Sequence, residues 1–232
     1  VRDLAVEVPG ATRAFEKLGI DYCCGGGRSI EDACFGAGAS LEEVMAALEA
    51  GKERYAGKEN ENWQSRSLAE LTDHIVRKHH DYTKSELERL DQLSAKVASV
   101  HGKNHPELQK VRDLFLALQK DLIPHMLKEE QVLFPYIEQL EDASRNGRPA
   151  PRPFFATVRN PVRMMIQEHD TAGDLLRELR TASCDYAVPA DGCTSYQALY
   201  QALQELEQDL HQHIHLENNI LFPRAVTLES GG

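Results

Sequence analysis

The distribution of apolar residues along the chain predicts an all-α protein. Leu, Ala, Glu, Gln and Lys recur with the spacing of amphipathic helices, and Val, Ile and Thr form none of the alternating runs that strands require. Four long helices are expected, at residues 67–99, 106–140, 160–182 and 194–226. A Pro- and Gly-rich segment, 147–153, separates the second from the third, and the pattern favours an up-down four-helix bundle.

The first part of the chain is organised differently. Residues 1–57 are expected to form a small helical domain, with one helix at 12–18, a Cys-Cys-Gly-Gly-Gly turn at 23–27 and further helices near Ile30 and Leu41. The polar stretch at 57–62 is typical of a linker. The bundle domain is then expected to span residues 66–228.

Three of the expected helices begin with capping signals. In a capping box, a Ser and a Glu three residues later each satisfy a free backbone N–H group of the other. Pro suits the first helical position because an N–H group there has no helical partner. The signals are Ser40 with Glu43, Ser67 with Glu70, and an N-cap and first helical position at Asn160 and Pro161.

A motif repeated within the four helices carries the candidate chemistry. Segments 125–135 and 213–223 share a His-x-x-x-Glu pair and end in Leu-Phe-Pro. Upstream of each lies a His-Asp pair, whose histidines His80 and His169 precede the motif by 45 and 44 residues. The repeat therefore extends over a whole helical hairpin.

The spacing of the motif places its polar side chains on stripes that face the core. A His and a Glu four residues apart lie one turn apart on one helix face, where both reach the same metal cluster. Both pairs continue apolar stripes of their own helices. A buried carboxylate costs several kcal/mol unless it is paired or bound to metal, so Glu129 and Glu217 need compensation.

Hairpin geometry brings the upstream histidines to the same level, because residues equidistant from a turn lie at equal height in a bundle. The two midpoints fall at residue 102 and at residues 191–192, both in turn-like sequence. Mixed imidazole and carboxylate donors suit a dinuclear site for iron, manganese or zinc. The alternative is that these histidines and glutamates satisfy one another in a polar network without metal. Two matched copies of the motif make this alternative less favoured. The predicted ligands are His80, His125, Glu129, His169, His213 and Glu217.

The remaining histidines fit this site less well. His211 and His215 share a stripe with polar residues and are expected to be solvated. His79 neighbours His80 but faces elsewhere. His101 lies 21 residues beyond His80, which is about 30 Å along a continuous helix, so it is too remote to be a primary ligand unless the helix breaks early.

Composition and charge narrow the classes of function. The chain has 232 residues, 41% of them hydrophobic, enough for one good core and a small extra domain. A net charge of −11, spread along the chain, argues against nucleic acid as a partner. No apolar run is long enough to cross a membrane. Nothing at the start resembles a signal peptide, although a chain that begins at Val1 leaves a removed leader open.

The five cysteines lack the regular spacing of a disulfide framework, which favours a reducing compartment and a cytoplasmic protein. Cys34, Cys184 and Cys193 are expected to be ordinary thiols. Cys23 and Cys24 precede three glycines, whose backbone amides are able to stabilise a thiolate. Adjacent cysteines do not easily chelate a metal without other donors, so a structural turn and a role in thiol chemistry or transfer both stay open.

Two features together resemble one known family. The stretch 18–26, Leu-Gly-Ile-Asp-Tyr-Cys-Cys-Gly-Gly, and the repeats ending in Leu-Phe-Pro resemble the iron-sulfur cluster repair di-iron proteins, or repair of iron centres family. These join an ScdA-type N-terminal domain to a hemerythrin-like bundle. The resemblance covers nearly the whole chain. Cys23 and Cys24 match the family's cysteine pair, and His101 matches a histidine that recurs in relatives.

The resemblance implies two iron ions, oxo- or hydroxo-bridged, held by the six predicted ligands. It also implies repair of iron-sulfur clusters damaged by nitric oxide or oxidative stress, by donation of iron to a damaged or apo iron-sulfur protein. Our hypothesis is that the pair holds iron firmly when ferric and less firmly when reduced. The acceptor and the oligomeric state, including a homodimer, stay open.

Three other functions compete with this one. The site could bind or sense nitric oxide or oxygen without losing iron. A ferritin-like oxidase is less favoured because no Glu-x-x-His motif occurs in the chain. A purely structural helical adaptor requires that the two glutamates hold no metal.

Overall fold

The structure is a computed structural model that describes residues 1–8, 10–55 and 63–231. All regular elements in those ranges are helical, which confirms the predicted all-α class. The linker expected at residues 57–62 lies outside the described residues. The chain forms two compact units, one of Val1–Thr72, Ile137–Arg152 and His211–Gly232, the other of Asp73–Tyr136 and Pro153–Leu210.

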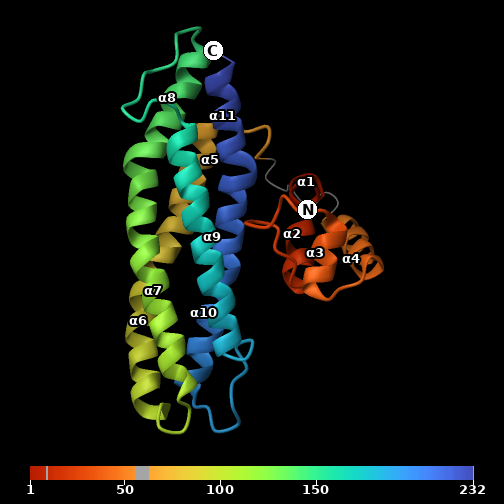
Figure 1. Cartoon of the computed structure of the whole chain (residues 1–232), viewed down its shortest axis with the longest axis vertical. Helices are drawn as coiled ribbons and strands as arrows, with labels where there is room; N and C mark the ends of the chain where they lie inside the picture. The colour runs from red at the N-terminus through yellow and green to blue at the C-terminus, as the bar shows by residue number, and fades with distance from the viewer. Residues whose placement is uncertain (9, 56–62, 232) are drawn as a thin grey trace. The chain divides into compact units, whose positions relative to one another are not determined.

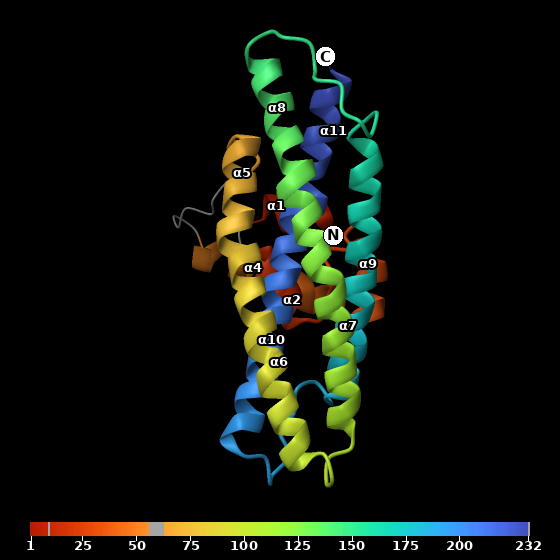
Figure 2. The ribbon, with the colours of Figure 1, turned by 90° about the vertical axis from the view of Figure 1, so that its left-hand side faces the viewer.

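The second unit is the predicted four-helix bundle (Figure 1). Two antiparallel hairpins form it, and their connections lie at the same end of the unit (Figure 2). The turns fall near residue 102 and at residues 183–193, as hairpin geometry predicts. The helices are α6 (Asp81–His101), α7 (Glu107–Lys128), α9 (Arg159–Ala182) and most of α10 (Thr194–Leu216).

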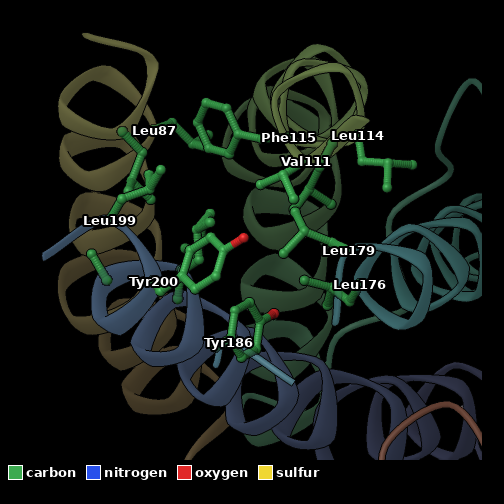
Figure 3. Packing of buried hydrophobic residues seen from close by; sticks show 14 of the residues in the cluster. Leu87, Val111, Leu114, Phe115, Leu176, Leu179, Tyr186, Leu199 and Tyr200 are labelled. Carbon is green, nitrogen blue, oxygen red and sulfur yellow. The ribbon is translucent and has the colours of Figure 1, made fainter. Parts of the chain in front are cut away.

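The apolar stripes of these four helices meet in one core. Figure 3 shows Leu87 of α6, Phe115 of α7, Leu176 of α9 and Tyr200 of α10 turned toward one another. All four are buried. Because apolar residues recur every three or four positions, each helix presents a continuous apolar surface to the other three. Burial of these surfaces is the main stabilising term for the unit.

Three of the four predicted helices contain a π-helical turn, which the sequence pattern did not predict. The other boundaries agree closely with expectation, except that the second and fourth helices run on to Arg145 and Ser230. The first helix is α5 (Leu68–His74), η1 (Ile75–His80) and α6; the second is α7, η2 (Glu129–Leu133) and α8 (Phe134–Arg145); the fourth is α10, η3 (Glu217–Leu221) and α11 (Phe222–Ser230).

Two of the π turns have a cause in the repeated Leu-Phe-Pro sequence. The ring of a proline inside a helix clashes with the carbonyl group four residues earlier. For Pro135 and Pro223 that carbonyl belongs to Gln131 and Asn219, which lie within η2 and η3. A wider turn relieves the clash without ending the helix.

The N-terminal helices belong to the first unit, with a core that includes Phe15, Ile20 and Val44. The first of these N-terminal helices, at residues 2–7, was not expected from the sequence. At Gly19 the chain leaves the second helix with φ +67°, which favours glycine. The helices are α1 (Arg2–Glu7), α2 (Ala11–Lys17), α3 (Ile30–Ala37) and α4 (Leu41–Tyr55).

Both predicted capping boxes are confirmed. The Ser40 N–H donates to Glu43 at 2.8 Å and the Glu43 N–H to the Ser40 hydroxyl at 3.1 Å. Ser67 and Glu70 exchange the same bonds at 3.0 and 3.1 Å. The N-cap expected at Asn160 was wrong by two residues, because α9 begins at Arg159 after Val158. The Asn160 amide donates instead to a carbonyl group in the preceding loop.

Truncation of a core leucine tests the bundle packing. Leu179 is 1% exposed and Leu127, a matched leucine on α7, is 42% exposed. We expect Leu179→Ala to lower the free energy of unfolding by about 2–5 kcal/mol, because the mutation leaves a cavity. Leu127→Ala should change it by less than about 0.5 kcal/mol. Urea titration followed by circular dichroism measures both, and equal effects would contradict the core assigned here.

Candidate metal centre

The structure brings all six predicted ligands together. Two groups of four side chains each offer donor atoms that lie within 4.8 Å of one another. The groups share Glu129 and Glu217 and differ only in their histidines, and every member is buried. Two imidazoles and two shared carboxylates per group suit a pair of neighbouring metal ions. The groups are His80, Glu129, His213, Glu217 and His125, Glu129, His169, Glu217.

Glu129 shows most directly that these residues fit a cation. Its side chain is fully buried at the start of η2, and neither carboxylate oxygen has a hydrogen-bond partner within the described part of the chain. Its Oε2 atom lies 3.5 Å from His80 Nε2 and 3.3 Å from His125 Nε2. Burial of a charged carboxylate in this way costs several kcal/mol unless a cation balances it.

The imidazoles are turned so that their Nε2 atoms converge. His125 Nε2 and His169 Nε2 lie 3.0 Å apart, and their rings meet edge to face. Two imidazole nitrogens bound at right angles to one ion, each about 2.0–2.1 Å from it, would also lie about 3 Å apart. On the fourth helix, His213 Nε2 lies 3.0 Å from Glu217 Oε1, one turn further along.

A carboxylate holds the outer nitrogen of His80. His80 Nδ1 lies 2.7 Å from Glu130 Oε1, which also accepts from Lys84 Nζ at 2.6 Å. Burial would raise the pKa of Glu130, but the hydrogen bonds from Lys84 and His80 outweigh it and lower the pKa. An ionised Glu130 fixes the proton on Nδ1 and so leaves the Nε2 lone pair for a metal.

The same arrangement recurs at His125. Its Nδ1 atom lies 2.8 Å from Glu168 Oε2, and Lys128 donates to the other oxygen of that carboxylate. The hydrogen bond from His125 is the main cause that lowers the pKa of Glu168 to about 2. Sequence reasoning missed Glu130 and Glu168. The only signal for them is that each adjoins a predicted ligand, with a lysine three or four residues after the histidine it holds.

Two histidines that the sequence set aside lie apart from both groups of donors. His79 is buried, and its Nδ1 atom contacts Asp209 Oδ1 at 3.0 Å. His101 ends α6, as continuous helix geometry predicts, and its Nε2 atom lies 3.1 Å from Cys193 Sγ. Neither is a member of the two groups.

The expectation that His211 and His215 are solvated was wrong. His215 is 5% exposed and His211 is half-buried. Tyr22, from the N-terminal part of the first unit, covers this face of the helix, with ring centroids 5.4 Å from His215 and 6.4 Å from His211. Burial lowers the pKa of His215 to about 4. The polar stripe on this helix is therefore a packing surface for a segment that lies far away in the sequence.

The cysteines divide into distinct environments, and none of the five forms a disulfide. Cys23 is buried and Cys24 half-buried, in the predicted turn. Cys193 is exposed directly before α10, and backbone N–H groups, chiefly that of Tyr196, together with His101 lower its pKa to about 7. The expectation of an ordinary thiol was therefore wrong for Cys193, because the helix start and a distant histidine stabilise its thiolate.

Comparison with known proteins agrees with this geometry. Residues 71–225 match the family described as the hemerythrin HHE cation binding domain, and residues 1–52 match ScdA_N, a domain of unknown function (DUF542). The chain belongs to the hemerythrin HHE family. Both matches fall within the predicted domains, 66–228 and 1–57, whose limits stay a prediction.

Relatives of this hemerythrin HHE protein match along nearly the whole chain. It is 34% identical to the "Iron-sulfur cluster repair protein YtfE" of Enterobacter sp. (strain 638), over 98% of this chain and 96% of the relative. It is 35% identical to the "Probable iron-sulfur cluster repair protein" of Haemophilus influenzae, over 97% and 95%. The YtfE of Escherichia coli O8 (strain IAI1) is 36% identical, over 98% and 96%. The suspected family is thus confirmed, and the cation-binding family agrees with the buried groups of donors.

None of the helices in the described ranges combines the length and apolar character needed to span a membrane.

Neutralising the outer carboxylates tests how they orient the imidazoles. We expect Glu168→Gln and Glu130→Gln each to weaken metal binding by about 10–100-fold, because the histidine loses the partner that fixes its proton. Glu178→Gln, on the exposed face of α9, is the matched control. Competition against a chromophoric chelator measures the affinity. Unchanged affinity in both variants would mean that these carboxylates do not orient the ligands.

Alkylation tests the lowered pKa of Cys193. We expect the rate of labelling at Cys193 by iodoacetamide to rise through a midpoint at about pH 7, because the thiolate is the reactive form. Cys184, an exposed thiol in the same connection, is the control for access of the reagent. In His101→Gln the Cys193 midpoint should move to higher pH. Peptide mass spectrometry separates the two sites, and identical pH profiles would refute the assignment.

Proposed function

We propose that this protein binds two iron ions at the six buried residues and repairs iron-sulfur clusters damaged by nitric oxide or oxidative stress. Iron is its cargo, which it donates to a damaged or apo iron-sulfur protein. The single observation that carries the proposal is the pair of buried donor groups in a chain whose relatives, matched over nearly their whole length, are named iron-sulfur cluster repair proteins.

The donor groups suggest which residue holds which ion. We assign His80 and His213 to one ion and His125 and His169 to the other, with both carboxylates shared. An oxo or hydroxo bridge between ferric ions is part of the proposal, and near-ultraviolet absorption would reveal it. Zinc and manganese suit the same donors, so metal analysis of the purified protein decides among them.

Sharing of the two carboxylates between the ions lowers the free energy that is needed to lose one ion. If each ion had its own glutamate, departure of one would leave a buried carboxylate without a cation, at a cost of several kcal/mol. With Glu129 and Glu217 shared, the remaining ion still balances both. Reduction weakens the attraction further, because a ferrous ion carries less charge than a ferric one. We therefore propose that an external one-electron donor reduces the ferric pair, that protons from solvent convert the bridging oxygen to water, and that one Fe²⁺ then leaves.

We also propose a cytoplasmic location. The five cysteines, none of which forms a disulfide, support it, because thiols persist in reducing compartments and tend to pair in oxidising ones. Iron-sulfur proteins with damaged clusters are the proposed partners.

Transfer of iron tests this function. Protein loaded with isotopically labelled iron is incubated under reducing, oxygen-free conditions with a dehydratase whose cluster nitric oxide has damaged. We expect the dehydratase to recover activity and acquire label, with the loss of roughly one ion from each donor chain. Glu217→Gln should hold little iron and restore little activity, because both ions lose a ligand.

The control is Glu205→Gln, a carboxylate variant on the exposed face of the same helix, which should transfer iron normally. If the dehydratase does not recover activity and the loaded protein retains its iron, the donor role is rejected. Reversible binding of nitric oxide without loss of iron would then favour a sensor. Unchanged metal content in Glu217→Gln would reject the site itself.

A further inference from the structure

A second cluster of metal-ligating side chains lies in the loop that follows α2. Asp21, Cys23 and Cys24 offer a carboxylate oxygen and two sulfurs that all lie within 4.8 Å of one another. The two Sγ atoms are 3.8 Å apart, and Cys23 Sγ lies 3.4 Å from Asp21 Oδ1. Adjacent cysteines need another donor to chelate a metal well, and Asp21 supplies it.

We propose that Asp21, Cys23 and Cys24 form a separate binding site for one thiophilic divalent cation. The distances are those that such an ion requires. In a tetrahedral site, with metal–sulfur bonds of about 2.3 Å and metal–oxygen bonds of about 2.0–2.2 Å, two sulfurs lie about 3.8 Å apart and a sulfur and an oxygen about 3.6 Å apart. Three vertices are thus in place, and the fourth is left for solvent or for a ligand from another protein.

The backbone holds the carboxylate in position for this role. Asp21 Oδ1 accepts hydrogen bonds from the amide groups of Cys23, at 3.1 Å, and Cys24, at 3.0 Å. The following glycine allows the approach, because a Cβ atom at Gly25 would lie 3.0 Å from Asp21 Oδ2. At Gly26 a Cβ atom would lie 2.8 Å from the Tyr22 carbonyl oxygen, so this turn also needs glycine.

Metal binding at this loop is coupled to the loss of the thiol protons, because the thiolate and not the thiol is the metal ligand. Binding exchanges one divalent cation for the two thiol protons, which pass to solvent, and this exchange makes affinity rise with pH.

The loop is fastened to the helix that carries two of the buried ligands. The Asn219 side chain donates to the Tyr22 carbonyl group at 3.0 Å, and the Tyr22 ring packs against His215. Asn219 and His215 each lie two residues from Glu217, on the opposite side of the same helix. Resting on the proposed repair function, the loop is assigned as a waypoint that receives Fe²⁺ after it has left the dinuclear centre.

Cobalt binding tests the site, because a sulfur-to-cobalt charge-transfer band arises only at thiolates. Protein that has been purified without oxygen, with its dinuclear centre filled with ferric iron, is titrated with Co²⁺. We expect one Co²⁺ to bind per chain with this band and to release two protons. The band should weaken strongly in Cys24→Ser, and Asp21→Asn should lower the affinity by at least about tenfold.

Cys184→Ser is the matched control and should keep the band. Iron content should be the same in all variants, which separates failure of this loop site from failure of the dinuclear centre. No charge-transfer band, or a band that survives in Cys24→Ser and Asp21→Asn, would overturn the site. Circular dichroism checks that each variant is folded. In the iron-transfer assay, Cys24→Ser and Asp21→Asn should slow delivery at unchanged iron content, and an unchanged rate would overturn the waypoint role.

Discussion

Two carboxylates buried among four imidazoles are the constraint on which the rest of this structure depends. Glu129 is fully buried and lacks hydrogen-bond partners in the described part of the chain, so the folded state carries an electrostatic cost that a cation removes. Glu217 is buried to the same extent. The free energy of metal binding therefore also stabilises the folded state, because the unfolded chain does not hold these donors together. The apolar core of the bundle packs α6, α7, α9 and α10 together.

The constraint extends outward from the donors in two ways. Three of the six residues, His80, Glu129 and Glu217, lie at the edge of a π turn, where the helix widens and changes the direction of its side chains. Beyond the imidazoles, Glu130 and Glu168 hold the outer nitrogens and are themselves balanced by lysines. Charge thus alternates in sign from the centre to the surface, which lets a buried polar site exist in an otherwise apolar bundle.

The N-terminal segment adds a second kind of metal chemistry to the same chain. Hard and intermediate donors, oxygen and imidazole, occupy the helices, whereas soft sulfur donors occupy the loop at residues 21–24. The loop is tied to the helix of Glu217 through Tyr22. Under the function proposed above, a protein that holds iron and also releases it benefits from two sites of different affinity, since the tighter site alone would retain its cargo.

Periodicity and the repeated motif were enough to predict the four long helices, their hairpin turns and the convergence of six side chains, because helix register and turn position decide which residues share a face and a height. They did not predict the π turns, α1, the outer carboxylates or the burial of His215. The outer carboxylates and the burial of His215 depend on contacts between residues far apart in the chain. Glu168 meets His125 only after α7 and α9 pack together, and His215 loses its solvent only when Tyr22 covers it. Asp21 completes the cysteine pair because backbone amides turn its carboxylate toward the sulfur, a local fold that residue spacing does not specify.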